Sequence, residues 1–212
     1  MRHTWVVEAC IGAGKSELLK QFRAGLAKKD LKKIIFLKEP DFTNISIAGT
    51  KVNALERIYS STEKDEFVVC QFLIQRALSD YYTTELEKID DDIEICIMDR
   101  WIPSCYIFCE MARRRGIISN YTKKHLDVFI KLEQEHFLSK LGDSEVHKLF
   151  LDTPAKQCAK NVMSRGRVEE VILGEEKWAE IGQSFTEIAL NMNSYDVVGN
   201  AQELQETMKS CL

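Results

Sequence analysis

Residues 4–16, TWVVEACIGAGKS, decide the predicted fold of this chain. The apolar run Thr4–Val7 predicts a buried strand, and the segment after Ser16 has the apolar periodicity of an amphipathic helix. A strand, a glycine-bearing turn and a helix are the context that a Walker A phosphate-binding loop requires. The backbone N–H groups of such a turn point inward and bind phosphate oxygens. We therefore predict that nucleotide phosphates bind to Ile11, Gly12, Ala13, Gly14, Lys15 and Ser16.

Two side chains of this loop carry chemistry of their own. Lys15 is expected to neutralise the β- and γ-phosphates, and the hydroxyl of Ser16 is expected to ligate Mg²⁺. One residue departs from the motif, because Ala9 stands where the first glycine is usual. Alanine is costly at a position that needs a positive φ, and it fits elsewhere. The loop predicts phosphate binding without identifying the acceptor.

Short apolar runs alternate along the chain with longer segments of 3.6-residue periodicity, which is typical of a parallel sheet covered by helices. Five strands are expected, at Thr4–Val7, Lys33–Leu37, Ile93–Met98, His147–Leu151 and Tyr195–Val198. Helices are expected to begin near Lys15, Thr50, Asp65, Pro103, Thr122, Pro154, Glu175 and Ala201. No linker divides residues 1–212, so we predict one domain with a three-layer α/β fold, a five-stranded parallel sheet with helices on both faces.

The charge and amino-acid composition of the chain exclude some classes of binding partner. The net charge of the 212 residues is −4, which provides no global field that favours nucleic acid or an anionic membrane. No apolar stretch approaches the roughly 20 residues that span a bilayer. The seven cysteines form no CxxC pair and are interpreted as reduced thiols, and the four scattered histidines lack metal-ligand spacing. We expect a cytoplasmic protein that binds small molecules, and neither nucleic acid nor a membrane.

Charged residues follow the second and third predicted strands, at the edge where open α/β sheets bind ligands. Glu39, in Lys38-Glu39-Pro40, is a candidate general base that would accept the proton of an attacking hydroxyl. A surface glutamate before a turn-forming proline is the alternative. In Asp99-Arg100-Trp101, Asp99 would hold Mg²⁺, and Arg100 would stabilise charge that develops between donor and acceptor.

The helix expected from Asp65 has an inner stripe formed by Phe67, Gln71, Ile74, Leu78 and Tyr81. A glutamine in such a stripe is costly unless it is hydrogen-bonded, and its amide suits the edge of a nucleobase. If the helix phase is off by one residue, Gln71 is instead half exposed.

The segment Asn161–Glu170 carries Arg165 and Arg167 on either side of Gly166. Two arginines that flank a glycine predict a mobile fork that folds over phosphates. The alternative interpretation is a pair of basic groups at the C-terminal end of a helix dipole. We favour this second interpretation for the run Arg113-Arg114-Arg115.

The order and spacing of these motifs resemble the deoxynucleoside kinase family, and more distantly the thymidylate kinases, over nearly the whole chain. The residues that carry the resemblance are Glu8–Ser16, Glu39-Pro40, Asn53-Ala54-Leu55, Tyr59, Gln71, Asp99-Arg100, Ser104 and Thr153-Pro154 through Arg165–Glu170.

The resemblance implies a role for each site residue. Glu39 would deprotonate the 5′-hydroxyl of a deoxynucleoside, and Arg100 would contact that oxygen. Gln71 would pair with the base, while Tyr59 and Glu170 would hold the 3′-hydroxyl. Arg165 and Arg167 would belong to a lid at about residues 161–172. ATP with Mg²⁺ would be the phosphate donor, and a homodimer would form through helices after the third strand.

Several positions depart from the family pattern. Asp99-Arg100-Trp101 stands where the family has Glu-Arg-Ser, and Asn44 replaces a tryptophan that lines the base pocket. Asn161 replaces an arginine of the lid. Relatives that take deoxycytidine and purines carry an arginine and an aspartate where this chain has Leu78 and Cys105. An apolar pair suits the 5-methyl group of thymine, so we predict a preference for thymidine and deoxycytidine over purines.

Two alternative functions stay open. A thymidylate kinase, which phosphorylates dTMP to dTDP, would use Lys38 or Arg76 to bind the acceptor monophosphate. A nucleotide-binding protein without transfer activity is suggested by Ala9 and Asn161, although a pure binder has no use for Glu39.

Overall fold

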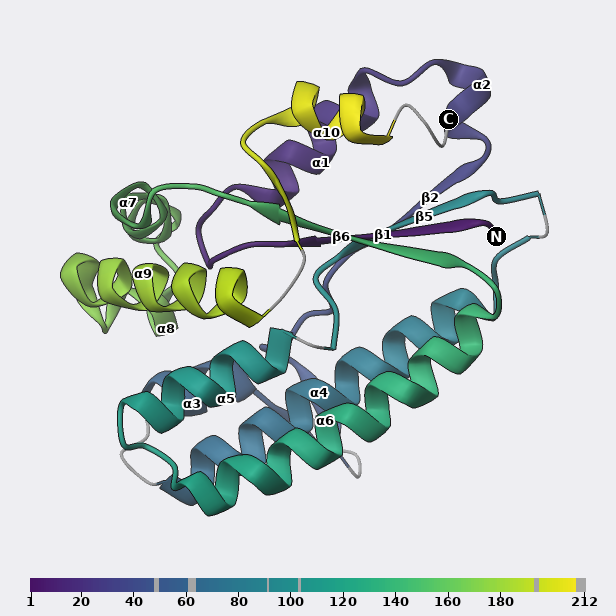
Figure 1. Ribbon diagram of the computed structural model, residues 1–212. Coiled ribbons are helices and arrows are strands. Elements are labelled where there is room, and N and C mark those ends of the chain that lie inside the picture. Colours follow the sequence, from purple (N-terminus) through teal and green to yellow (C-terminus); the bar gives the residue numbers. More distant parts are fainter. Residues whose placement is uncertain (48–49, 61–63, 91, 103, 193–194, 209–212) are drawn as a thin grey trace.

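A five-stranded parallel sheet runs through the centre of the protein (Figure 1). The computed structural model describes residues 1–47, 50–60, 64–90, 92–102, 104–192 and 195–208. The strands of the sheet are β1 (His3–Glu8), β2 (Ile34–Leu37), β5 (Ile95–Asp99), β6 (Glu145–Leu151) and β7 (Asp196–Val198). Their order is β2-β5-β1-β6-β7, and every neighbouring pair is parallel, which confirms the predicted fold class.

Helices cover both faces of this sheet (Figure 1). One face carries α1 (Lys15–Ala24), α2 (Lys28–Leu31) and α10 (Ala201–Met208). The other carries α3 (Ala54–Ser60), α4 (Lys64–Leu86), α5 (Ser104–Arg114) and α6 (Asn120–Leu141). Near the carboxyl ends of the strands lie α7 (Ala155–Arg165), α8 (Val168–Val171) and α9 (Gly174–Met192). None of the helices in the described ranges is long and apolar enough to cross a membrane.

The central strands read as continuous apolar runs because both of their faces are buried. Trp5 and Val7 of β1 pack into a core shared with α1, α9 and α10, whereas Val6 packs into a second core with α4, α5 and α6. Val6 lies opposite Met98 of β5 in the ladder, and Met98 belongs to the same second core. The sheet thus separates two hydrophobic cores.

A small antiparallel hairpin was not predicted. It consists of β3 (Ile45–Ile47) and β4 (Thr50–Val52), so the prediction that a helix begins at Thr50 is wrong and α3 begins at Ala54. Strands of three residues are too short for an alternating pattern to stand out. The observed α1, α4, α6, α7, α9 and α10 begin within two residues of their expected positions, the ordinary scatter of helix ends. The four-residue helices α2 and α8 were not predicted. The helix start expected at Pro103 lies outside the described residues.

Candidate active site

A cavity of about 890 Å³ lies at the carboxyl ends of β1, β2 and β5. Cavities of this size accommodate small-molecule ligands and cofactors. Its lining contains every residue that the sequence analysis assigned to the site: Ile11, Gly12, Ala13, Gly14, Lys15, Ser16, Glu39, Tyr59, Gln71, Leu78, Asp99, Arg100, Cys105, Arg165, Arg167 and Glu170. The fold therefore brings together residues that are far apart in the sequence, and their individual roles stay predictions.

The phosphate loop is held tightly against α7. Gly12 has a φ of +82°, and a Cβ atom there would lie 2.3 Å from the carbonyl oxygen of Cys158, so only glycine fits. Asn161 Nδ2 donates a hydrogen bond to the Gly12 carbonyl over 2.8 Å. The Thr153 hydroxyl donates to the Ala13 carbonyl over 2.9 Å. Asn161, which departs from the family pattern, thus binds the phosphate loop through its backbone.

Ala9 does not distort the loop. The one non-glycine residue with a positive φ in the described chain is Arg100, so Ala9 adopts a backbone conformation that alanine tolerates. Its side chain is fully buried in the core beneath the loop. The departure from the motif therefore carries no backbone strain.

Lys15, Ser16 and Asp99 form a polar group at the mouth of the loop. Lys15 Nζ lies 3.0 Å from Asp99 Oδ1, and both side chains are largely buried. The Ser16 hydroxyl donates to Asp99 Oδ2 over 3.5 Å. A carboxylate and a hydroxyl are the oxygen ligands that Mg²⁺ prefers, so these two residues fit the predicted metal position.

Arg100 lies between two carboxylates at the end of β5. Its Nε atom forms an ion pair with Glu39 Oε1 over 2.9 Å, and its Nη1 atom donates to Glu8 Oε1 over 3.0 Å. Burial by itself would lower the pKa of Arg100, but the charges of Glu39 and Glu8 raise it above the ordinary value. The guanidinium is therefore a fixed positive charge beside the candidate base.

The backbone around Arg100 is strained and is held by a tyrosine. Arg100 has a φ of 76°, in the left-handed region that disfavours side chains other than glycine. The buried Tyr82 hydroxyl lies 2.8 Å from the carbonyl oxygen of Asp99 and 3.0 Å from that of Arg100. Burial raises the pKa of Tyr82 well above its ordinary value, so the phenol stays protonated and can donate. Non-glycine residues with such strain are often found at functional sites.

Glu8 is a buried residue of the site that the sequence analysis did not assign. Its carboxylate is fully buried and accepts hydrogen bonds from Arg100, from the Ala9 N–H group at 2.9 Å and from the Ser104 hydroxyl. Burial raises the pKa of Glu8, while the charges of Arg100 and Lys15 oppose the shift. A carboxylate that directly follows a buried strand was the available signal.

The predicted base pocket lies between α4 and α5. Gln71 is 5% exposed, so the alternative of a half-exposed glutamine is wrong. Its Oε1 atom is buried, and no hydrogen-bond partner for it lies within the described residues. Leu78 and Cys105 are both buried in the same wall. The fully buried tyrosine of this helix is Tyr82, whereas the predicted stripe had ended with Tyr81.

Arg165 and Arg167 both face Glu170. Two nitrogen atoms of Arg165 donate to the two oxygen atoms of Glu170 over 3.0 and 2.6 Å, and Arg167 Nη1 lies 3.7 Å from Glu170 Oε1. The carbonyl of Glu170 accepts a 2.7 Å hydrogen bond from Trp178 Nε1. Tyr59 packs edge-on against Trp178, and burial, followed by the charge of Glu170, raises its pKa. The candidate lid is thus tied to the wall that carries Tyr59.

Two basic residues were considered for an acceptor monophosphate. Lys38 lines the cavity, but Arg76 does not. Arg76 pairs instead with Asp80 over 2.8 Å and with Glu133 over 3.4 Å on the helical side of the molecule. Of the two groups considered for a thymidylate kinase, only Lys38 lies at the cavity.

Solved structures of one enzyme share this architecture. Deoxyadenosine kinase from M. mycoides with the products dCMP and a flexible dCDP bound has a TM-score of 0.65 and 19% sequence identity, over 98% of this chain and 97% of that chain. The structure of the same enzyme with bound dATP has a TM-score of 0.65 and 19% sequence identity, over 98% of this chain and 100% of that chain. The structure with bound dCTP has a TM-score of 0.65 and 20% sequence identity, over 98% of this chain and 97% of that chain. At this level of identity, the likeness shows a shared fold.

Comparison with curated proteins found no match. The family model for deoxynucleoside kinase matches residues 5–208, nearly the whole chain. The match covers the phosphate loop, the two charged strand ends and the segment with Arg165 and Arg167. This chain is therefore a phosphotransferase that belongs to the deoxynucleoside kinase family.

Proposed function

We propose that this protein transfers the γ-phosphate of ATP to the 5′-hydroxyl of a deoxynucleoside, with a preference for pyrimidine bases. One observation carries the proposal: Glu39 Oε1 and Arg100 Nε lie 2.9 Å apart in the cavity that also contains the phosphate loop and Gln71. A carboxylate beside a fixed cation is what an attacking hydroxyl needs, because one group takes its proton and the other stabilises its oxygen.

The proposed step is an in-line displacement. The 5′-oxygen forms a bond to the γ-phosphorus while the bond from that phosphorus to the bridging oxygen breaks, so that ADP leaves. Glu39 accepts the hydroxyl proton, and Lys15 neutralises charge on the transferred group. Because the guanidinium of Arg100 is already oriented by Glu8, it need not reorganise during the reaction.

We propose ATP with Mg²⁺ as the donor. Asp99 and the Ser16 hydroxyl would hold the cation, which would reduce the negative charge of the β- and γ-phosphates when bound. Lys15, which is ion-paired with Asp99, would contact the phosphates from the same side. The loop's backbone N–H groups supply the remaining phosphate contacts.

The acceptor would lie between α4 and the segment that contains Arg165. We propose that this segment, at about residues 161–172, forms a lid. We also propose that residues 1–212 form a single domain. Gln71 has a buried amide oxygen, Oε1, that has no hydrogen-bond partner within the described residues. A donor group on the edge of a nucleobase would supply that hydrogen bond. Glu170 and Tyr59 are proposed to bind the 3′-hydroxyl, and Arg165 and Arg167 to exclude water from the phosphates.

The pyrimidine preference follows from Leu78 and Cys105. Both are buried in the cavity wall, and neither offers a strong hydrogen bond to the extra edge of a purine. Their apolar surface suits the methyl group of thymine. The structurally similar M. mycoides enzyme is named as a deoxyadenosine kinase, but identity near 19% leaves the base preference of this chain open to measurement.

A substrate panel tests the reaction. Thymidine, deoxycytidine, deoxyadenosine, deoxyguanosine and dTMP are offered separately with ATP and Mg²⁺, and ADP release is measured. We expect turnover of the deoxynucleosides, with a higher kcat/KM for the two pyrimidines. Consumption of dTMP alone would favour the thymidylate kinase alternative, and no turnover of any acceptor would favour a pure binder. Equal kcat/KM for purines and pyrimidines would contradict the base preference.

Replacement of Glu39 tests the mechanism. Glu39→Gln keeps the size of the side chain and removes the base, so kcat should fall by about 10²-fold or more while nucleotide binding stays nearly unchanged. Glu180→Gln on the exposed face of α9 is the matched control and should behave like the wild type. Unchanged turnover in Glu39→Gln would exclude Glu39 as the base.

We also propose a homodimer in the cytoplasm. Exposed apolar side chains on α4 and α6 support a second copy as partner: Val69, Phe72, Tyr121, Val128 and Leu132. On α5, the helix that directly follows β5, Ile107 and Met111 are buried in the core of the chain itself. The cytoplasmic location is supported by the six cysteines within the described residues, which are buried free thiols, as in a reducing compartment.

A further inference from the structure

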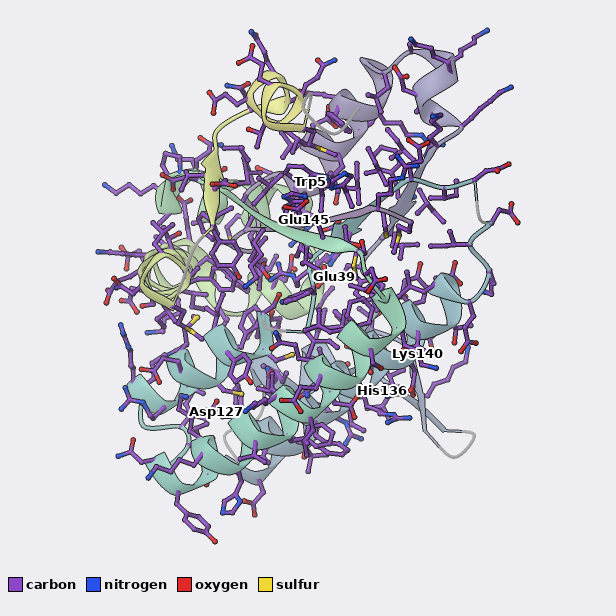
Figure 2. The ribbon with its side chains drawn as sticks, turned by 45° about the vertical axis from the view of Figure 1, so that its right-hand side comes forward. Trp5, Glu39, Asp127, His136, Lys140 and Glu145 are labelled. Atoms are coloured by element: carbon purple, nitrogen blue, oxygen red, sulfur yellow. The ribbon has the colours of Figure 1, made fainter. Side chains whose placement is uncertain are left out.

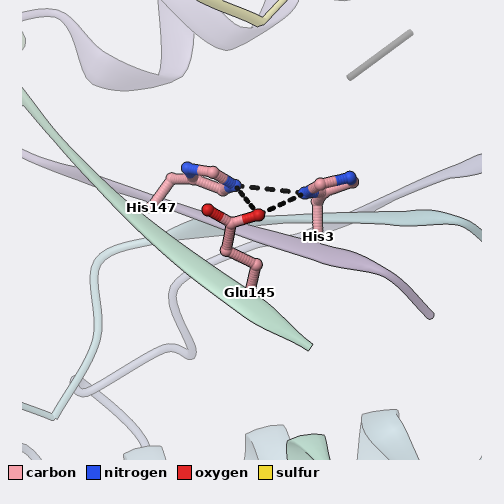
Figure 3. Close-up of side chains that lie close together, drawn as sticks. All are labelled: His3, Glu145 and His147. Atoms are coloured by element: carbon pink, nitrogen blue, oxygen red, sulfur yellow. Dashed lines mark hydrogen bonds and ion pairs between the residues drawn. The ribbon is translucent and has the colours of Figure 1, made fainter. Parts of the chain in front are cut away.

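Two histidines and a glutamate meet at the amino ends of β1 and β6 (Figure 3). The cavity lies at the other end of the sheet, at the carboxyl ends of the strands. His3 lies directly opposite Glu145 in the parallel ladder, and His147 follows Glu145 by two residues on the same strand. Because side chains alternate along a strand, Glu145 and His147 share a face of the sheet with His3. A separation of 144 residues between the two histidines hides this cluster from sequence spacing.

The three side chains converge through one atom each. His3 Nδ1 lies 3.1 Å from His147 Nε2, Glu145 Oε2 lies 3.6 Å from His3 Nδ1, and it lies 3.8 Å from His147 Nε2. A tetrahedral zinc ion with bonds of about 2.1 Å has ligand atoms about 3.4 Å apart. The observed triangle is therefore close to one face of that tetrahedron, and only small side-chain shifts would bring all three atoms into contact with a cation.

The surroundings hold one ring in place and leave the cluster accessible. His147 stacks on Trp5 with 4.0 Å between the ring centroids and 12° between the ring planes, and Trp5 is itself buried in the core. The side chains of His3 and His147 are 23% and 19% exposed, whereas Glu145 is 68% exposed. An ion could therefore reach the cluster from solvent, and a water molecule could complete its coordination.

We propose that His3, Glu145 and His147 form a binding site for a zinc-type divalent cation. Two imidazoles and a carboxylate favour zinc and neighbouring transition metals, whereas Mg²⁺ and Ca²⁺ prefer sets of oxygen ligands. The chemistry of this site thus differs from that of Ser16 and Asp99, and the two sites select different ions.

The site stabilises the fold and takes no part in phosphate transfer. None of its three residues lines the cavity, and the five-residue rise from His3 to Glu8 separates the two ends of β1 by roughly 16 Å. A cation held by β1 and β6 joins the amino ends of two neighbouring strands. Because it binds only the folded chain, it stabilises that state. The inference does not depend on the proposed kinase substrate.

Zinc titration of the full-length chain without an affinity tag tests the site directly. The protein is stripped with a chelator, ZnCl₂ is titrated by calorimetry, and the visible spectrum of a Co²⁺-loaded sample reports tetrahedral nitrogen and oxygen coordination. We expect one Zn²⁺ per chain, with excess MgCl₂ failing to displace it. His3→Asn, His147→Asn and Glu145→Gln should each weaken binding by at least about tenfold.

The matched control is His136→Asn. His136 lies on the outer helix α6, well apart from Glu145 (Figure 2), so its replacement should leave zinc binding unchanged. Glu145→Gln guards against misfolding, because its exposed side chain should leave the Tm of the metal-free protein at the wild-type value. Zn²⁺ should raise the Tm of the wild type and of His136→Asn more than that of Glu145→Gln. No zinc binding by the wild type, or equal binding by the wild type and the three ligand variants, would overturn the proposal. Loss of binding in His136→Asn would overturn it as well.

Discussion

Arg100 combines a strained backbone with a fully paired side chain. A left-handed conformation costs an ordinary residue about 1–2 kcal/mol, and the hydroxyl of Tyr82 and the hydrogen bond from Arg100 N to the Val7 carbonyl oppose that cost. Its guanidinium reaches Glu39 on one side and Glu8 on the other. The strained turn therefore aims the charge of Arg100 at the place where the acceptor hydroxyl is proposed to bind.

Replacement of Glu8 should separate positioning from substrate binding. Glu8→Gln retains the shape of the side chain and removes its charge, which leaves Glu39 to balance Arg100 alone. We expect kcat to fall by about 10- to 100-fold with the KM for ATP nearly unchanged, because the phosphate loop keeps its own contacts. The free energy of unfolding should fall by about 1–3 kcal/mol, the cost of weakening a buried charged hydrogen bond.

Steady-state kinetics and urea denaturation check this prediction, with Glu180→Gln as the exposed control. A variant whose KM rises while its kcat is preserved would show that Glu8 acts on binding instead. Full activity together with full stability would remove Glu8 from any account of the site.

Sequence reasoning at the residue scale worked where a motif follows a strand. Glu39, Asp99 and Arg100 were located because the carboxyl ends of parallel strands meet at one edge. Tyr82 and His147 could not be located in this way. Their importance depends on contacts with the carbonyl groups of Asp99 and Arg100 and with a ring on another strand, and these contacts follow from the packing of the folded chain.

The phosphate loop and α7 behave as one packed unit. Gly12 packs so closely on the backbone of Cys158 in α7 that a Cβ atom would not fit between them. The hydrogen bonds from Asn161 and Thr153 fix the loop to α7 and to the turn before it. The loop therefore presents a preformed set of N–H groups, and the same helix leads directly to the candidate lid at Arg165. Movement of α7 would be transmitted to both.

Gly12→Ala should disrupt this unit. The new Cβ would lie 2.3 Å from the Cys158 carbonyl in a residue with a φ of +82°, so the loop must shift. We expect the KM for ATP to rise at least about tenfold, and stability to fall by about 2 kcal/mol or more.

Gly116→Ala provides the comparison for Gly12→Ala, because Gly116 also has a positive φ of +70° but has open space around its Cβ position. It should lose only about 1 kcal/mol of stability and keep the wild-type KM for ATP. Denaturant unfolding of both variants measures the loss of stability, and steady-state kinetics at varied ATP concentration measures the change in KM. Equal effects on KM would mean that the clash with α7 is unimportant.

The elements that the sequence predicted best are those with long, regular patterns. The five sheet strands were recognised because β1 and β5 are continuous apolar runs between charged or turn residues. The hairpin of β3 and β4 was missed because each strand has only three residues, too few for an alternating pattern to stand out. Asn161 was interpreted as a defect of the lid, since its bond to the Gly12 carbonyl depends on the folded loop.

The C-terminal end of α5 should contribute to acid sensitivity. Arg113, with help from Arg114, lowers the pKa of Glu110 from its ordinary 4.5 to about 2. Because the folded-state pKa is depressed, the stabilisation is fully present above about pH 4.5 and is lost as the pH falls towards 2. Arg114 also pairs with Glu187, which joins α5 to α9.

Glu110→Gln should therefore lower the free energy of unfolding by about 1–2 kcal/mol at pH 7, allowing for the solvent exposure of the arginines. The difference from the wild type should shrink as the pH falls from 4.5 towards 2. Urea unfolding at several pH values measures this, with Glu135→Gln on exposed α6 as the control. A difference that stays constant across this range would assign the effect to packing.

At the scale of the whole molecule, the cavity lies where two cores meet. The core around α1, α9 and α10 supports the phosphate loop, and the core around α4, α5 and α6 supports Gln71, Leu78 and Cys105. The donor and acceptor sides of the proposed reaction are thus built on opposite faces of one sheet, and Arg100 stands between them.

The outer surface of α4 and α6 is the part of the molecule that we expect a second copy to cover. The two helices lie side by side (Figure 1), and Phe72 of α4 stacks on Phe129 of α6 with 4.3 Å between the ring centroids. Along α6, Tyr121, Val128 and Leu132 recur at helical spacing and are 73%, 60% and 58% exposed. Exposed apolar side chains gathered on one surface are typical of an interface.

Leu132→Glu should convert the dimer to a monomer, because a charge on this surface cannot be buried against its own copy without a large desolvation cost. Light scattering after size-exclusion chromatography measures the mass at micromolar concentration. Val197→Glu changes a residue of similar exposure on β7 and should leave the dimer intact. Because Leu132 does not line the cavity, the monomeric variant should keep its turnover. A wild type that elutes as a monomer, or a Leu132→Glu protein that remains dimeric, would contradict the proposed assembly.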